Sequence, residues 1–147
     1  MIQISCALLI GVLLLSADGA GVTTPLHRAA SSGDVELAAS LLADGADVNA
    51  ENNSGARPMH LVAIKDNVEI AALLLLHGAD LEATDNRKRT PLHRAVDSTS
   101  PKMVEWLLRQ GSKYDAKDGD DQTPIDVAVR KAKEPVLESF RYYHLIA

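Results

Sequence analysis

A repeat of 33 residues constrains the fold of this chain more than any other feature of its sequence. Four short motifs begin at positions 24, 57, 90 and 123, so each follows the previous one by the same step. They read Thr24-Pro25-Leu26-His27, Arg57-Pro58-Met59-His60, Thr90-Pro91-Leu92-His93 and Thr123-Pro124-Ile125-Asp126. Because a fixed period of this length arises when equivalent structural units stack on one another, the sequence predicts a repeat architecture.

The first unit carries the signals of two short helices. The Thr24 hydroxyl can cap a helix, and proline is favoured at the first helical position because no N–H is needed there. Gly33 marks the end of this helix, and Gly45 marks the end of a second one. The apolar residues between the two glycines fall at helical spacing; they are Val35, Leu37, Ala38, Leu41 and Leu42. We therefore expect one pair of helices in each unit.

These units resemble the ankyrin repeat, whose 33-residue period carries a T-P-L-H-x-A signature. The resemblance covers residues 24–147, with repeats beginning near residues 24, 57, 90 and 123. The fourth repeat is degenerate and terminal, since Asp126 replaces the histidine and no Gly-Ala pair closes it. The resemblance implies an all-α ankyrin-repeat solenoid of stacked helix-turn-helix units. It also implies projecting β-hairpin or turn fingers, which we place at residues 46–56 (finger one), 79–89 (finger two) and 112–122 (finger three).

Four residues stand where the repeat favours glycine. Lys88 and Asp121 occupy the turn position that Gly55 holds in finger one, and Asp66 and Thr99 replace the glycine at the end of the first helix. Glycine tolerates left-handed backbone conformations that other residues adopt at a cost. We expect local adjustments at these positions within an unchanged fold.

Residues 1–23 form a hydrophobic segment that two interpretations fit. Residues 2–17 carry no charge, and the apolar run is followed by Ala17-Asp18-Gly19, which resembles a signal-peptidase site with cleavage near Gly19. No lysine or arginine precedes the run, however, and most ankyrin-repeat proteins work inside cells. The segment is therefore either a signal peptide or a capping helix over repeat one. The expected localisation depends on the same choice. The resemblance implies a cytoplasmic or nuclear protein, whereas cleavage of the segment would imply a secreted one. The run is shorter than the roughly 18 to 20 apolar residues of a membrane span.

The sequence carries no motif for catalysis, so we expect no enzyme, no cofactor and no small-molecule substrate. A G-x-S-x-G elbow, a glycine-rich phosphate loop and an H-E-x-x-H motif are all missing from it. His27, His60 and His93 lie one per repeat, and helices pack roughly 8 to 10 Å apart, whereas zinc needs each nitrogen at about 2.0 to 2.1 Å. We therefore expect no metal site, and the resemblance implies that each histidine forms hydrogen bonds near its own turn.

Charge argues for a protein or peptide partner. The formal net charge of −5 gives no general attraction for nucleic acid, and Arg87-Lys88-Arg89 is a local exception. The resemblance places binding in a concave groove formed by the finger tips and the first helices, an extended surface that repeat proteins commonly use. Carried over position by position, it gives three patches of candidate partner-binding residues. The neutral patch is Ser31, Ser32, Glu51, Asn53, Ser54 and Ala56; the basic patch is Ile64, Lys65, Thr84, Asn86, Arg87 and Arg89; the acidic patch is Asp97, Ser98, Lys117, Asp120 and Gln122.

A groove that changes from basic to acidic favours a partner with the complementary order of charges. The same charges would also be expected if they only kept the fingers soluble. We predict a protein–protein interaction module, acting as an adaptor, scaffold or inhibitor. The alternative is the ankyrin portion of a larger multidomain regulatory protein or enzyme, with catalysis elsewhere. The sequence leaves the partner's identity and the oligomeric state open.

Overall fold

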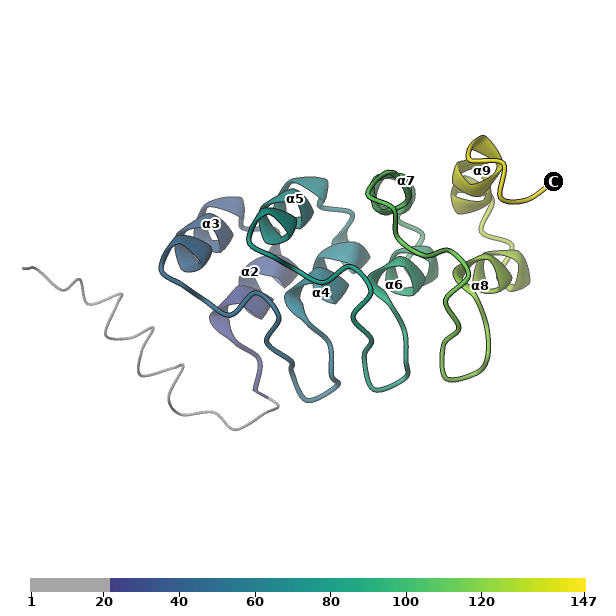
Figure 1. Cartoon of the computed structure of the whole chain (residues 1–147). Coiled ribbons are helices and arrows are strands. Elements are labelled where there is room, and N and C mark those ends of the chain that lie inside the picture. Colours follow the sequence, from purple (N-terminus) through teal and green to yellow (C-terminus); the bar gives the residue numbers. More distant parts are fainter. Residues whose placement is uncertain (1–21) are drawn as a thin grey trace, which may run out of the picture.

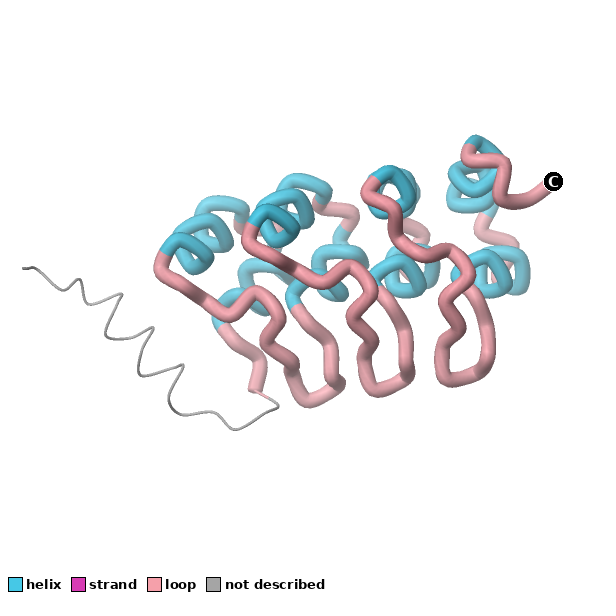
Figure 2. The backbone as a smooth tube through the Cα atoms, viewed as in Figure 1, coloured by secondary structure: helices cyan, strands magenta, loops and turns pink. Residues whose placement is uncertain are grey.

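The computed structural model describes residues 22–147, which form four pairs of helices (Figure 1). The first helices of the pairs lie in one row, the second helices lie in a second row, and the fingers project from the first row as turns (Figures 1 and 2). The described residues contain no strand element. The pairs are α2 (Pro25–Ser32) with α3 (Val35–Ala43), α4 (Pro58–Lys65) with α5 (Val68–Leu76), α6 (Pro91–Asp97) with α7 (Pro101–Arg109), and α8 (Pro124–Arg130) with α9 (Glu134–Tyr142). The predicted all-α repeat fold is confirmed, with fingers of the turn type.

The first helices begin where the repeated motif predicts. Thr24, Thr90 and Thr123 are the N-caps of α2, α6 and α8, and each hydroxyl accepts a hydrogen bond from the backbone N–H three residues later. Each cap is followed by proline, whose missing N–H costs nothing at this position. Arg57, the N-cap of α4, has no hydroxyl and makes no such bond. The proline and the neighbouring repeats are therefore sufficient to start that helix.

Small side chains let the first helices pack closely. Fully buried alanines lie on all four of them: Ala29 and Ala30 on α2, Ala63 on α4, Ala95 on α6 and Ala128 on α8. Larger residues fill the space between the two rows of helices; fully buried examples are Leu26, Met59, Ile70, Leu74, Leu92, Met103, Leu107 and Phe140. Helix α4 packs against both α2 and α6, so the core runs continuously through the stack.

The residues that replace glycine keep the glycine backbone. Gly33 ends α2 with φ of +78°, and Asp66, Thr99 and Ala132 have φ of +56°, +58° and +48° at the corresponding turns. Lys88 has φ of +56°, compared with +69° at Gly55. The side chain of Asp66 compensates for part of this strain, because its Oδ1 accepts a hydrogen bond of 2.7 Å from the N–H of Met103 in the next repeat. The expected adjustments are thus in hydrogen bonding, while the path of the backbone is conserved.

The proposed signal peptide or cap, residues 1–23, lies almost wholly outside the described residues, which begin at Val22. Within residues 22–147, no helix is both long enough and apolar enough to cross a membrane.

Candidate functional site

One side chain organises each finger from within. In finger two this residue is Asp85, whose Oδ1 accepts hydrogen bonds from the backbone N–H groups of Arg87 (2.9 Å) and Arg89 (3.0 Å). Asn52 and Asp118 lie one repeat before and one repeat after Asp85 and accept equivalent bonds in fingers one and three. The tight turn of each finger is therefore held by a side chain at the same repeat position.

Asp85 also neutralises Arg89. The carboxylate is buried, and its Oδ2 lies 2.8 Å from the Arg89 guanidinium. Burial raises the pKa of Asp85, but the backbone and side-chain hydrogen bonds from Arg89 outweigh burial and hold that pKa below its usual value. Arg89 therefore serves first as an internal partner of finger two.

The finger tips are bonded to one another. The N–H of Asn86 donates to the carbonyl oxygen of Ser54 (3.0 Å), and its side-chain amide donates to that of Asn53 (3.2 Å). Fingers two and three are joined in the same way, because the N–H of Gly119 donates to the carbonyl oxygen of Arg87 at 2.8 Å. A Cβ at Gly119 would lie 2.9 Å from that oxygen, which explains the glycine. These bonds hold the fingers in a fixed order.

Three buried histidines join each first helix to the finger that follows it. Nε2 lies within hydrogen-bonding distance of a carbonyl oxygen: for His27 that of Ala56 (2.9 Å), for His60 that of Arg89 (3.0 Å), and for His93 that of Gln122 (3.0 Å). Each Nδ1 accepts the backbone N–H of the N-cap residue, so the ring proton is on Nε2. The expected bond near each histidine's own turn is present, and the second bond ties each first helix to the last residue of the finger that follows it.

Burial lowers the pKa of all three histidines, more than the carbonyl partners raise it. The neutral ring is therefore the form that fits both hydrogen bonds. In the part of the chain that the structure describes, no group of three His, Cys, Asp or Glu residues is arranged to hold a metal ion.

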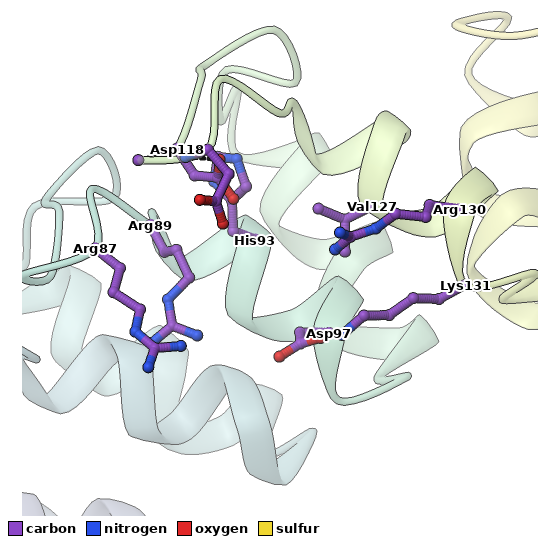
Figure 3. A pocket seen from close by; sticks show the side chains of 10 residues that line it. Arg87, Arg89, His93, Asp97, Asp118, Val127, Arg130 and Lys131 are labelled. Atoms are coloured by element: carbon purple, nitrogen blue, oxygen red, sulfur yellow. Dashed lines mark hydrogen bonds and ion pairs between the residues drawn. The ribbon is translucent and has the colours of Figure 1, made fainter.

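A charged cavity of 420 Å³ lies between fingers two and three and helices α6 and α8. Figure 3 shows Arg87 and Arg89 side by side at one end and Arg130 and Lys131 reaching in from the other. Four candidates from the basic and acidic patches line this cavity: Arg87, Arg89, Asp97 and Asp120. Six further residues complete the lining: His93, Asp118, Gly119, Val127, Arg130 and Lys131.

Two of these cavity residues, Arg130 and Lys131, lie outside the candidate set from the sequence. They follow Asp97 and Ser98 by one repeat, so extending the same register into the fourth repeat would have found them. Lys131 forms an ion pair with Asp97, which links α8 to α6 across the cavity. Burial raises the pKa of Asp97, but the hydrogen bond from Lys131 and its charge outweigh burial and lower it.

The other candidates lie outside this cavity. Exposed residues among them are Ser31, Ser32, Asn53, Ser54, Lys65, Thr84, Asn86 and Ser98, while Ile64 and Gln122 are half-buried. Two exposed candidates form ion pairs with neighbours, Glu51 with Arg57 and Lys117 with Asp121, each at 3.1 Å. Ala56 corrects the prediction: it is only 2% exposed, because it packs under finger one where its carbonyl meets His27. Its side chain is not available to a partner.

Stacked helix pairs that recur every 33 residues, with turns projecting from one row, place this chain in the class of helical-repeat solenoids. A family model described as "Ankyrin repeats (3 copies)" matches residues 26–118 and, in a second match, residues 75–140. The chain therefore belongs to the ankyrin-repeat family, as the sequence predicts. Ankyrin repeats are generally protein–protein interaction modules. A search of curated proteins gave no significant match to this chain.

Proposed function

We propose that this chain is a binding module without catalytic activity, which acts as an adaptor, scaffold or inhibitor by holding a protein or peptide segment. The segment would lie on the inner surface, by which we mean the three fingers together with the exposed sides of α2, α4, α6 and α8. The single observation that carries the proposal is the charged cavity between fingers two and three, whose walls come from repeats two, three and four.

The construction of the fingers supports this proposal. Their tips are bonded to one another and their bases are bonded to the histidines, so the inner surface loses little conformational freedom when a partner binds. The cavity is open to solvent and rich in charge, which suits the polar side chains of a peptide better than an apolar small molecule. Nothing in the sequence supplies a nucleophile with an activating base, so binding is the role we assign.

Crosslinking mass spectrometry on the full chain tests the proposal. Partners would be captured from a cell extract, and the crosslinked lysines would then be mapped. Lys65, Lys88 and Lys117 are exposed on the inner surface, whereas Lys102 is exposed on α7 in the outer row of helices. We expect one partner to crosslink at the first three lysines and to be lost on Arg87→Glu. Crosslinks confined to Lys102, with capture unaffected by Arg87→Glu, would contradict binding on the inner surface.

A further inference from the structure

The cavity is lined by basic side chains, and the protein itself pairs only some of them. Arg89 is paired with Asp85, and Lys131 is paired with Asp97. Arg87 lines the same cavity and is exposed, yet no ion pair or side-chain hydrogen bond reaches its guanidinium from residues 22–147. Arg130 lines the opposite end and likewise lacks an ion pair within this range. Arg87 and Arg130 therefore present guanidinium groups to the cavity that no carboxylate of residues 22–147 pairs.

Arg94 on α6 adds to this positive charge. It is half-buried, and its Nε is a buried donor with no hydrogen-bond partner in the described part of the protein. Burial lowers the pKa of Arg94, and the neighbouring charge of Arg89 lowers it further. Arg87 acts on the pKa of Arg94 in the same sense, whereas the carboxylates of Asp85 and Asp97 raise it. Three guanidinium groups thus lie within electrostatic range of one another, and an incoming anion would reduce their mutual repulsion.

Negative charge lies directly beside this cluster. Gly119, whose N–H is bonded to the Arg87 carbonyl, stands between Asp118 and Asp120. The Asp118 carboxylate accepts two backbone N–H groups and stays at the turn. Asp120 is exposed, lines the cavity and forms no ion pair with any residue that the structure describes. The charge along the cavity rim therefore changes from positive at finger two to negative at finger three.

We propose that the cavity recognises an extended peptide with an acidic side chain bound at Arg87 and a basic side chain bound at Asp118 and Asp120. This inference rests on the proposed function and names the chemistry of the ligand. The tips of fingers two and three are in contact, since the N–H of Gly119 lies 2.8 Å from the carbonyl oxygen of Arg87. An extended peptide advances about 3.3 Å per residue. The two charged side chains are therefore close together in the peptide, within about three residues of each other.

The acidic rim distinguishes this ligand from a nucleic acid. A polyanion whose first phosphate met Arg87 would bring its next phosphates against Asp118 and Asp120, because every nucleotide carries the same charge. A peptide can instead change sign at the required position. The net charge of −5 acts in the same direction, since it repels a polyanion over the whole surface.

The test is a selection from a random dodecamer peptide library displayed on phage, with the full chain as bait. We expect the selected peptides to be enriched in Asp or Glu within about three positions of Lys or Arg. One selected peptide is then synthesised with a fluorophore, and its binding is measured by fluorescence anisotropy. Its charge-reversed analogue and a mixed-sequence single-stranded DNA dodecamer serve as comparison probes.

Two matched variants locate the interaction. Arg87→Glu reverses an exposed charge in the cavity, and Lys102→Glu makes the same change of charge on α7, in the other row of helices. We expect Arg87→Glu to weaken binding of the selected peptide at least tenfold and Lys102→Glu to change it less than twofold. In a second selection, Arg87→Glu should favour peptides with a basic residue at the formerly acidic position. Asp120→Lys should reverse the preference at the other position.

The outcomes separate this inference from the proposed function. Peptides selected without the paired charges, or bound equally well by Arg87→Glu, would overturn the inference while leaving binding on the inner surface to the crosslinking test. A selection that returns no peptide above background overturns the inference as well. Tighter binding of the DNA dodecamer than of any selected peptide, with a steep loss on added salt, would replace it with nucleic-acid binding.

Discussion

His27 reaches from Nε2 to the carbonyl oxygen of Ala56, 2.9 Å away and 29 residues further along the chain. The equivalent bonds of His60 and His93 have the same sequence separation. Each bond joins the start of a first helix to the last residue of the finger that leads into the next repeat. The histidines thus support the inner surface from within. They are buried, so a ligand could not reach their side chains.

Replacing His60 with leucine should cost about 2 to 3 kcal/mol of unfolding free energy, because the N–H of Arg57 and the carbonyl of Arg89 both lose their partner. Urea denaturation measures this loss. His77→Leu is the matched control, since His77 is exposed at the end of α5 and its removal should change stability by less than about 0.5 kcal/mol. Equal effects of the two substitutions would contradict the supporting role.

The free energy of unfolding should fall as the pH is lowered below about 6.5, where histidines of the unfolded chain take up protons. In the unfolded chain a histidine titrates near pH 6.5, whereas burial lowers the pKa of His27, His60 and His93 in the folded state. Between these values the unfolded state binds more protons, so stability is complete above about pH 6.5 and decreases below it by up to about 1.4 kcal/mol per pH unit for each histidine.

Urea titrations at several pH values from 7.5 down to 5 measure this slope. His60→Leu removes one of the three groups and should make the slope shallower, independently of its effect at neutral pH. A slope that His60→Leu leaves unchanged would assign the acid sensitivity to other groups. Asp126 replaces histidine in the fourth repeat, and the hydrogen bonds from the N–H and hydroxyl of Thr123 lower its pKa. Its contribution is therefore lost only under more acidic conditions than theirs.

The repeat register predicted most of the fold, because caps, prolines and buried apolar residues are set by local chemistry at each position. The same register predicts Arg87 and Asp120 as finger residues that face a partner, and both line the cavity; Arg130 also lines it but lies in the degenerate fourth repeat. The bond from Gly119 to Arg87 could not be predicted from the sequence, since it depends on how far one finger stacks over the next. The prediction that Ala56 contacts a partner was wrong for a related reason. Its position in the repeat indicates that it lies in a finger, but not that the finger covers it.

Ala132→Gly should stabilise the protein by about 0.5 to 1 kcal/mol, since Ala132 adopts φ of +48° at the end of α8 and a left-handed alanine is strained. Ala132 is exposed, so little packing is lost with its methyl group. Ala43→Gly at the end of α3 is the control and should be destabilising, because Ala43 is an exposed residue in a helix. Thermal denaturation of the pair gives the comparison, and two substitutions with the same sign would refute the argument from strain.

Substitutions at two leucines of α5 distinguish the contribution of packing between helices from that of helix formation itself. Leu74 is 0% exposed and Leu76 is 81% exposed, so an aspartate at the first position buries an unpaired charge and one at the second does not. Leu74→Asp should lower the unfolding free energy by more than about 4 kcal/mol, enough to unfold a chain of ordinary stability. Leu76→Asp should leave the circular dichroism spectrum and melting temperature nearly unchanged. A folded Leu74→Asp protein would be incompatible with the stack.

Gly119→Ala should loosen the contact between fingers two and three. The added Cβ would lie 2.9 Å from the carbonyl oxygen of Arg87, and neither side can move away easily because the N–H of residue 119 is bonded to the same oxygen. We expect a loss of about 1 to 3 kcal/mol, as for other substitutions that overfill a close contact. Hydrogen exchange at the amide of residue 119 should become faster, because this N–H is the donor of the bond between the fingers.

The neighbouring substitution Asp120→Ala provides the control for this change. Asp120 is exposed at the same finger tip, so its removal should alter stability by less than about 0.5 kcal/mol and leave exchange at residue 119 unchanged. The two variants also divide the roles of the finger: Gly119 fixes where finger three lies, whereas Asp120 supplies charge at the cavity. If Gly119→Ala exchanged as slowly as the parent protein, the fingers would be held by the histidines alone, and the bond between their tips would be dispensable.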